Sequence, residues 1–383
     1  MLPRIFFRYN TARSFFNGII ALTCFLLTLM AIAFSWRRNH GLKVKAPLTS
    51  QNVKRLRLEH TNTTKSSEKI ISMLHFPSYY ELKMGGIHFE HCKIKTCTLT
   101  DNPDHLTTSD AVMFYTPVKP ITPPPKTPGQ IWVYFVEESP LHSRTELFGG
   151  PEWENLINWT MTYRKDSDIV FGYGVVHNKT ERGPQKDYYA IAKAKTKLIA
   201  WFVSNCNTKS QRMKYVKLLQ KFVPVDVYGD CGSLKCPKNK EIGCIEMLNT
   251  DYKFYLSFEN SLCLDYVTEK LYRMLKYDVI PIARGWANYS KYLPNKSVIS
   301  TSDFFTVRDL AELIKHLDSN MDEYLKYFSW KSSYSIEEPQ AMPLCEICEK
   351  VHNPEKWHNI YKNVADWWRT GTCHDPTDLV SEL

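Results

Sequence analysis

The chain has 383 residues, which is long enough for two domains with separate hydrophobic cores. A hydrophobic content of 43% and a charged content of 23% are ordinary for a globular protein and exclude a low-complexity chain. The formal net charge of +9 would suit an anionic ligand or a membrane surface, although solvated lysines are the simpler explanation, and we expect no nucleic-acid partner.

The N-terminal residues contain a candidate membrane anchor. Residues 14–36 carry no charged side chain, and about 20 such residues span a bilayer as a helix. A cleaved signal peptide is the alternative, because the AIA triplet at 31–33 resembles a cleavage site, but the apolar stretch is longer than a usual signal-peptide core. We therefore expect a cytoplasmic tail over 1–13, a transmembrane signal-anchor over 14–36 and a flexible stem over 37–75.

Sequons and cysteines indicate on which side of the membrane the rest of the chain lies. Basic residues flank both ends of the apolar segment, so the positive-inside rule does not decide. Ten cysteines follow the span, an even number that suits disulfides and hence an oxidising compartment. The candidate N-glycosylation sites are Asn62, Asn158, Asn178, Asn288 and Asn295. Together these features predict a type II membrane protein.

Beyond residue 75 the sequence alternates between apolar runs and helical patterns. Strands are expected at 131–136, 197–205, 224–229, 253–260, 278–285 and 295–301, and helices at 210–222, 265–276 and 306–317. This alternation predicts an α/β fold with a parallel sheet, and ligands bind at the carboxyl ends of such strands. The expected parts are an N-terminal domain over 76–190, a C-terminal domain over 191–350 and a tail over 351–383 that packs back on them.

Polar residues follow the strand at 253–260 and enter the next expected helix. A helix that begins near Asp265 would place Tyr266, Lys270 and Arg273 on one face, with Glu269 beside it. Its N-terminus and basic groups would bind phosphate, while the carboxylate would accept protons from sugar hydroxyls. A nucleotide-sugar would use both kinds of group; an ordinary salt-bridged surface helix is the alternative.

Two further clusters lie at expected strand ends. Ser204 and Asn205 end one strand, and Arg212 follows in the first turn of a helix, where its planar fork suits a diphosphate. The glutamates at 137–138, ahead of a turn with His142, offer a carboxylate that could act as general base, and the histidine could do so as well. A capped helix with an exposed arginine and a plain acidic loop are the respective alternatives.

The sequence offers only weak metal-site candidates. The DSD triplet at 166–168 directly follows two cationic side chains, Arg164 and Lys165, which disfavours the binding of a metal ion there. The segment CEICEKVH at 345–352 could be half a zinc site, but the oxidising topology and the cysteines at 92 and 97 favour disulfides. We expect no obligatory metal.

Six segments share one resemblance. In chain order they are FVEESPLHS, MTYRKDSDI, LIAWFVSNCNTKSQRMKYV, VDVYGDCG, FYLSFENSLCLDYVTEKLYRMLKYDVIPIARG and YLKYFSWK, within about residues 110–350. They resemble the blocks of the α1,3-fucosyltransferases of glycosyltransferase family 10, invertebrate members in particular. The resemblance implies a GT-B type α/β fold, in which two Rossmann-like domains face each other across a cleft. It also implies a Golgi membrane protein whose catalytic domain is lumenal.

The resemblance further implies an inverting enzyme that moves L-fucose from GDP-β-L-fucose to the 3-OH of N-acetylglucosamine in glycoprotein glycans. Glu138 would be the general base, and His142 would shape the acceptor side. The donor GDP-fucose would contact Ser204, Asn205, Arg212, Tyr228, Asn260, Tyr266, Thr268, Glu269 and Lys270. Because cationic side chains would replace a metal, a divalent cation such as Mn²⁺ would at most stimulate. The N-glycan core and outer Lewis-type units both fit as acceptors.

Two details accompany the resemblance. It implies disulfides that join Cys92 and Cys97 with Cys345 and Cys348, and assigns no partners to the other six lumenal cysteines. The family's usual VPVVLG reads IPIARG at 280–285, with Ala283 and Arg284 in place of apolar residues. This departure favours the alternative that the chain is a catalytically weak or inactive glycan-binding relative of the same fold.

Overall fold

The computed structural model describes residues 68–74, 86–116, 122–181, 186–236, 241–337 and 342–379. Within these ranges no helix is long and apolar enough to cross a membrane. The expected anchor at 14–36, the cytoplasmic tail at 1–13, most of the stem and the sequon at Asn62 lie outside the described residues.

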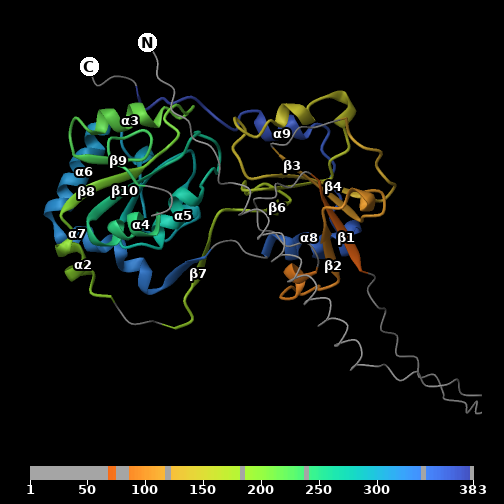
Figure 1. Cartoon of the computed structure of the whole chain (residues 1–383), viewed down its shortest axis with the longest axis horizontal. Helices are drawn as coiled ribbons and strands as arrows, with labels where there is room; N and C mark the ends of the chain where they lie inside the picture. Colours follow the sequence, from red (N-terminus) through yellow and green to blue (C-terminus); the bar gives the residue numbers. More distant parts are fainter. Residues whose placement is uncertain are drawn as a thin grey trace, which may run out of the picture. The chain divides into compact units, whose positions relative to one another are not determined.

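The first half of the chain forms a six-stranded sheet with the order β2-β1-β3-β4-β5-β6 (Figure 1). Its strands are β1 (Lys69–Leu74), β2 (Cys97–Thr100), β3 (Ala111–Thr116), β4 (Ile131–Val136), β5 (Trp159–Thr162) and β6 (Ile169–Val170). Every pairing is parallel, so the carboxyl ends share one edge. Strand β1 falls inside the expected stem, so the boundary at residue 75 is wrong. The apolar run of β1 is short and directly follows a Ser/Thr-rich tract, so sequence patterns assigned it to the stem.

Helices cover both faces of this sheet, which explains why β3 and β4 are apolar at successive positions. Phe114 belongs to the cluster of buried side chains that contains Trp368 of α9 (Val364–Arg369), whereas Met113 belongs to the cluster with Ile347 of α8 (Met342–His352). Alternate side chains of a strand point to opposite faces, so each face receives its own helix.

Helix α8 lies on this first sheet, although its residues were expected in the C-terminal domain at 191–350. Disulfides Cys92–Cys345 and Cys97–Cys348 hold it there. These are the four cysteines that the resemblance joins. A boundary drawn from the order of segments alone could not detect this return of the chain to its first domain.

A second, five-stranded parallel sheet has the order β12-β11-β10-β8-β9. Its strands are β8 (Lys197–Phe202), β9 (Val225–Tyr228), β10 (Tyr252–Phe258), β11 (Ile280–Arg284) and β12 (Ile299–Ser300). The helices of this half are α2 (Tyr188–Ala194), α3 (Arg212–Leu219), α4 (Glu241–Thr250), α5 (Glu269–Leu275), α6 (Val307–Ser319) and α7 (Met321–Leu325). Helices α3 and α6 share one buried cluster with the sheet, and α4 belongs to another.

A smaller feature completes the fold. Strands β7 (Val175–Asn178) and β13 (Tyr334–Glu337) pair antiparallel and so join segments far apart in the sequence.

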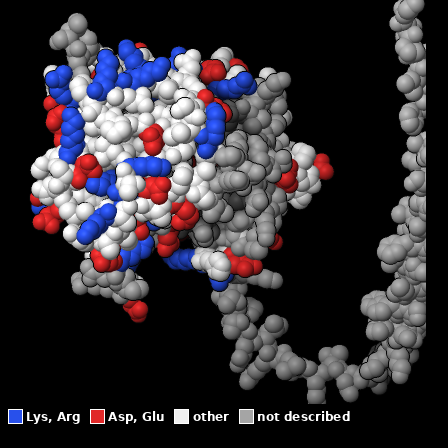
Figure 2. Space-filling model, turned by 60° about the vertical axis from the view of Figure 1, so that its left-hand side comes forward, with Lys and Arg blue, Asp and Glu red and all other residues white. Residues whose placement is uncertain are grey.

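On the face shown in Figure 2, Lys and Arg side chains are interspersed with Asp and Glu, and basic residues also gather along one edge.

The described sequons differ in how far their asparagines are available. Asn178, Asn288 and Asn295 are exposed. Asn158 is half-buried, and its Oδ1 accepts hydrogen bonds from the backbone N–H of Trp132 at 2.9 Å and from Lys126 Nζ at 2.6 Å. The Asn158 side chain is therefore held by hydrogen bonds within the fold and is less available for glycosylation than the three exposed asparagines.

The two disulfides of α8 should stabilise the protein jointly. They close loops of nearly the same length, with sequence separations of 253 and 251 residues. Either bridge alone keeps that loop closed, so Cys345→Ala or Cys348→Ala should each cost little. The double variant should lose about 2–5 kcal/mol of unfolding free energy, measured by urea denaturation. Single variants that each lose as much as the double variant would contradict this.

Candidate active site

The carboxyl ends of β8 and β10 form the floor of a pocket of about 450 Å³. The two strands are parallel neighbours, so the residues that follow them lie at the same edge of the sheet. Six of the nine residues expected to bind the donor line this pocket: Ser204, Asn205, Arg212, Asn260, Glu269 and Lys270. Arg273 of α5 and Tyr255 of β10 also line it.

Helix α5 begins later than the sequence suggested. Its first residue is Glu269, after the N-cap Thr268, rather than Asp265. Asp265 has a φ of 60°, a left-handed conformation that ends regular structure and that aspartate tolerates better than most residues. Its carboxylate accepts hydrogen bonds from the Tyr292 hydroxyl and from the backbone N–H of Lys165. The expectation that Tyr266 shares a helical face with Lys270 is therefore wrong.

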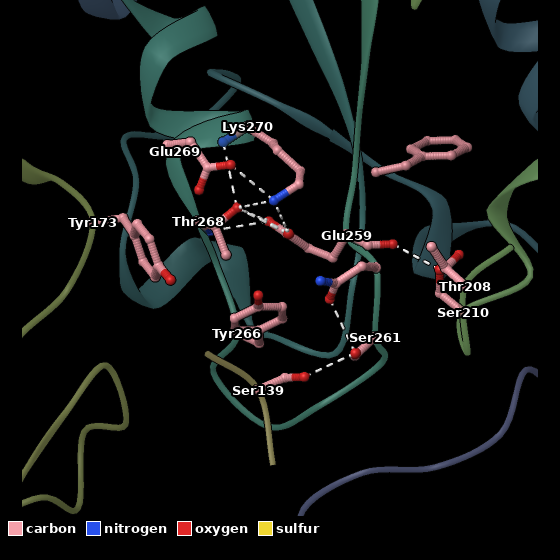
Figure 3. A network of polar contacts seen from close by, with 12 residues as sticks. Ser139, Tyr173, Thr208, Ser210, Glu259, Ser261, Tyr266, Thr268, Glu269 and Lys270 are labelled. Carbon is pink, nitrogen blue, oxygen red and sulfur yellow. Dashed lines mark hydrogen bonds and ion pairs between the residues drawn. The ribbon is translucent and has the colours of Figure 1, made fainter. Parts of the chain in front are cut away.

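A buried carboxylate organises the start of α5 (Figure 3). Glu259 directly follows β10 and is 2% exposed. Its oxygens accept hydrogen bonds from the backbone N–H and the hydroxyl of Thr268, each at 2.9 Å. Lys270 Nζ lies 3.3 Å from the same carboxylate. Sequence reasoning included Glu259 in the strand expected at 253–260 and gave it no role.

The charges of this network are coupled. Burial raises the pKa of Glu259, while Lys270 and Thr268 oppose that shift. Burial alone would lower the pKa of Lys270, but Glu259 and Glu269 raise it above its usual range, so the ammonium stays charged. Glu269 is exposed and accepts a hydrogen bond from Lys270 Nζ at 2.9 Å. Partial desolvation in the pocket would raise the pKa of Glu269, but Lys270 and nearby hydrogen bonds lower it, so this carboxylate stays ionised.

Arg212 is more buried than a freely accessible diphosphate ligand would be. Its side chain lies at 6% exposure, its Nη1 donates to the Phe258 carbonyl at 2.8 Å and its Nη2 donates to the Asn205 carbonyl at 3.1 Å. Its Nε is buried and has no hydrogen-bond partner among the residues that the structure describes. Burial lowers the pKa of Arg212. In this arrangement the guanidinium holds the strand ends together and contributes positive charge to the pocket.

The three other expected donor residues have different surroundings. Tyr228 is buried, and its hydroxyl lies 2.7 Å from that of Tyr252, so it packs beside β10. Thr268 is 0% exposed and bonds to Glu259. Tyr266 is buried, and its hydroxyl donates to Glu138 Oε2 at 3.2 Å. Burial raises the pKa of Tyr266 well above its usual range, so the hydroxyl remains a donor.

The expected base loop is joined to the pocket by a short chain of polar contacts. Glu138 follows β4 and is half-buried. Its neighbour Ser139 has its Oγ 2.9 Å from Ser261 Oγ, and that hydroxyl donates to Asn260 Oδ1 at 3.0 Å. Asn260 lines the pocket, so residues from the two sheets meet at this point. His142 is exposed in the turn that follows, where its backbone N–H donates to the Ser139 carbonyl.

Sequence reasoning missed Tyr173 beside this loop. Its hydroxyl donates to the Glu137 carbonyl at 2.6 Å, and Figure 3 shows it near Tyr266. The signal was absent because Tyr173 follows the short strand β6 and reaches the site only through the packing of the sheet.

Among the described residues, potential metal ligands do not cluster at this site. The one cluster found elsewhere in those residues consists of Cys97, Cys348 and His352, and both cysteines are in a disulfide. In the DSD triplet, Asp166 pairs with Arg164, and Asp168 accepts hydrogen bonds from the backbone N–H of Thr160 and the hydroxyl of Tyr361. Those carboxylates are occupied by protein groups.

The fold and the pocket define an α/β protein with a cationic, carboxylate-containing site at the carboxyl ends of a parallel sheet. The family description "Glycosyltransferase family 10 (fucosyltransferase) C-term" matches residues 192–367, and "Fucosyltransferase, N-terminal" matches residues 66–174. The chain belongs to glycosyltransferase family 10, the fucosyltransferases.

Relatives from several animals are similar to this chain. Alpha-(1,3)-fucosyltransferase C of Drosophila melanogaster is 35% identical over 304 residues, which cover 73% of this chain and 70% of the relative. Glycoprotein 3-alpha-L-fucosyltransferase A of the same species is 35% identical over 325 residues, which cover 81% of this chain and 62% of the relative. A crystal structure of an alpha1,3-fucosyltransferase with GDP-fucose has a TM-score of 0.49 and 17% identity, over 79% of this chain and 96% of that one.

Removal of the Lys270 cation should destabilise the protein in a pH-dependent way. Lys270→Met leaves the Glu259 carboxylate buried without its counter-charge, which should cost about 1–3 kcal/mol near neutral pH. The pKa of Glu259 is already raised in the folded state and should rise further. A carboxyl whose folded pKa exceeds its unfolded pKa is destabilising above that folded pKa. The loss should therefore shrink as the pH falls from about 7.5 to about 5, measured by urea denaturation.

Glu269→Gln is the matched control, because it removes the exposed partner of the same lysine. It should change stability by less than about 1 kcal/mol. Adding Glu259→Gln to Lys270→Met should restore part of the loss. A Lys270→Met variant that is equally destabilised at both pH values would contradict the proposed coupling.

Proposed function

We propose that this protein transfers L-fucose from GDP-β-L-fucose to the 3-OH of N-acetylglucosamine in glycoprotein glycans and forms an α1,3 linkage. The observation that carries the proposal is the polar connection between the Glu138 loop and the pocket at Asn260. A base and a donor site must lie together for such a reaction, and the residues proposed for these two roles come from different sheets. The proposed arrangement is of the GT-B type, with the acceptor on the side of Glu138 and His142.

In the proposed reaction, the acceptor hydroxyl attacks the anomeric carbon of fucose as Glu138 removes its proton. The new glycosidic bond forms while the bond between that carbon and the β-phosphate oxygen breaks, so configuration inverts in one displacement. Negative charge grows on the departing GDP. Lys270, which lines the pocket and is held charged, would stabilise that charge, with Arg212 adding to the positive potential.

The carboxylate of Glu269 would serve the sugar end of the donor. It lines the same pocket and stays ionised beside Lys270. An ionised carboxylate accepts hydrogen bonds from sugar hydroxyls and favours the positive charge that develops on the sugar ring. Fucose on Glu269 and diphosphate on Lys270 would use both groups at once.

The alternative of an inactive glycan-binding relative depended on Arg284. That residue is 1% exposed, pairs with Asp378 and is not among the residues that line the pocket. Its position therefore gives no reason to expect a blocked donor site, and the enzyme is the better-supported proposal.

The proposed location is the Golgi membrane, with residues 14–36 as a single-pass type II anchor, residues 1–13 in the cytoplasm and the catalytic region in the lumen. The apolar stretch at 14–36 and five disulfides support this arrangement. The acceptor is a GlcNAc-containing glycan. Incubation with defined N-glycan core and Lewis-type acceptors, followed by mass spectrometry, would decide between those two classes.

Glu138→Gln should reduce fucose transfer by about 10²–10⁴-fold, since glutamine cannot accept the proton. Binding of GDP should stay within about twofold of the wild type, because the substitution is isosteric and lies outside the donor pocket. Transfer is measured with GDP-fucose and a glycan acceptor, and binding by calorimetry. Glu137→Gln is the matched control and should keep most activity. A Glu138→Gln variant with wild-type turnover would remove Glu138 from this role.

Chelation should leave transfer largely intact, because protein cations are proposed to stabilise the leaving diphosphate. Assays with EDTA are expected to retain a substantial share of the rate measured without EDTA, and added Mn²⁺ is expected to stimulate at most severalfold. Complete loss with EDTA that Mn²⁺ restores would show that the reaction needs a metal.

A further inference from the structure

Arg284 is a buried charge with three well-defined partners. Its Nε and Nη2 donate to the two oxygens of Asp378 at 2.8 and 2.7 Å. Its Nη1 donates to the backbone carbonyl of Ser210 at 2.6 Å. The guanidinium also lies over the ring of Tyr215, 4.9 Å from its centroid. A carboxylate that accepts two hydrogen bonds compensates such a charge, while the third nitrogen of the guanidinium, Nη1, fixes the Ser210 carbonyl.

Ser210 in turn holds the pocket-forming residues. It is 0% exposed. Its backbone N–H donates to the Asn260 carbonyl at 3.0 Å, and its Oγ donates to the Glu259 carbonyl at 2.7 Å. Two residues further along the chain, Arg212 lines the pocket. Any movement of Ser210 would therefore shift the backbone at Asn260 and Arg212.

The C-terminal segment, defined here as residues 372–379, delivers Asp378 to this position. Cys373 forms a disulfide with Cys263. The Leu264 N–H donates to the Thr372 carbonyl at 2.8 Å, and the His374 N–H donates to the Leu262 carbonyl at 3.0 Å. The C-terminal segment thus lies along the loop that leads from Glu259 and Asn260 to α5, and Asp378 follows a few residues later.

We propose that Arg284 and Asp378 are positioning residues for the donor pocket. The C-terminal segment supplies the counter-ion with which Arg284 fixes the Ser210 carbonyl, and Ser210 sets the positions of Asn260 and Arg212 for the nucleoside diphosphate. Neither Arg284 nor Asp378 lines the pocket, so both act through Ser210. This inference rests on the proposed function in one respect only, namely that the ligand of the pocket is GDP.

The decisive variant is Asp378→Asn in the full chain, because it keeps the side-chain shape and removes the charge. Calorimetry should show an affinity for GDP that is about tenfold weaker. The KM for GDP-fucose should rise similarly, while kcat and the KM for the acceptor change less. Asp375→Asn is the matched control: it removes an exposed carboxylate from the same segment and should leave GDP affinity unchanged.

A second variant separates positioning from stability. Arg284→Leu/Asp378→Leu removes the buried guanidinium together with its more exposed carboxylate partner, so no unpaired buried charge remains, a change that often preserves stability. It should keep a near wild-type melting temperature but still bind GDP weakly, because the Ser210 carbonyl has lost its donor. Wild-type GDP affinity in either variant would overturn the inference. Because GDP binding is measured apart from transfer, a wild-type protein that binds GDP without transferring fucose would overturn the proposed function instead.

Discussion

Glu259 is only 2% exposed, and a carboxylate so deeply buried needs hydrogen-bond donors and a cation to compensate its charge. The residues that meet this need lie at the start of α5, beside the proposed donor pocket. The Glu259 side chain binds Thr268 and Lys270, which fixes the start of α5. Its backbone N–H donates to the Arg284 carbonyl of β11, and its own carbonyl accepts from Ser210. One residue at the end of β10 thereby joins β11, the loop before α3 and the first turn of α5.

The loop that carries Glu138, the proposed base, depends on the same region through fewer contacts. Tyr266 and Ser261 belong to the loop between β10 and α5, and they contact Glu138 and Ser139 from the other sheet. Because that loop starts at Glu259 and ends at Thr268, both of its ends are fixed by the buried network. The disulfide Cys263–Cys373 ties its middle to the C-terminal segment. The relative placement of the proposed base and the proposed donor pocket therefore depends on one loop with three attachments.

Sequence patterns predicted the parts of this structure that depend on residues close together in the chain. The apolar runs of the second sheet and six pocket-lining residues could be identified because strand ends and charged helix starts are visible in the chain itself. Three features could not be found in this way. The left-handed Asp265 depends on Tyr292 and Lys165, α8 belongs to the first sheet through disulfides, and Arg284 finds its partner 94 residues later. Each is determined by tertiary contacts.

The proposed donor would enter a site whose charges nearly balance. Glu259 and Glu269 face the cations of Lys270 and Arg212, and Arg273 also lines the pocket. A diphosphate would add negative charge, and we expect it to bind Lys270, whose ammonium is now paired with Glu259 and Glu269. Glu259 is buried and bonded to Thr268, whereas Glu269 is exposed and bonded to the lysine at 2.9 Å. Glu269 is therefore the carboxylate that can turn away, and a hydroxyl of the sugar would give it a new partner. The pocket would then exchange one ion pair for two contacts with the same donor, which favours a ligand that carries both a diphosphate and a sugar over the free diphosphate.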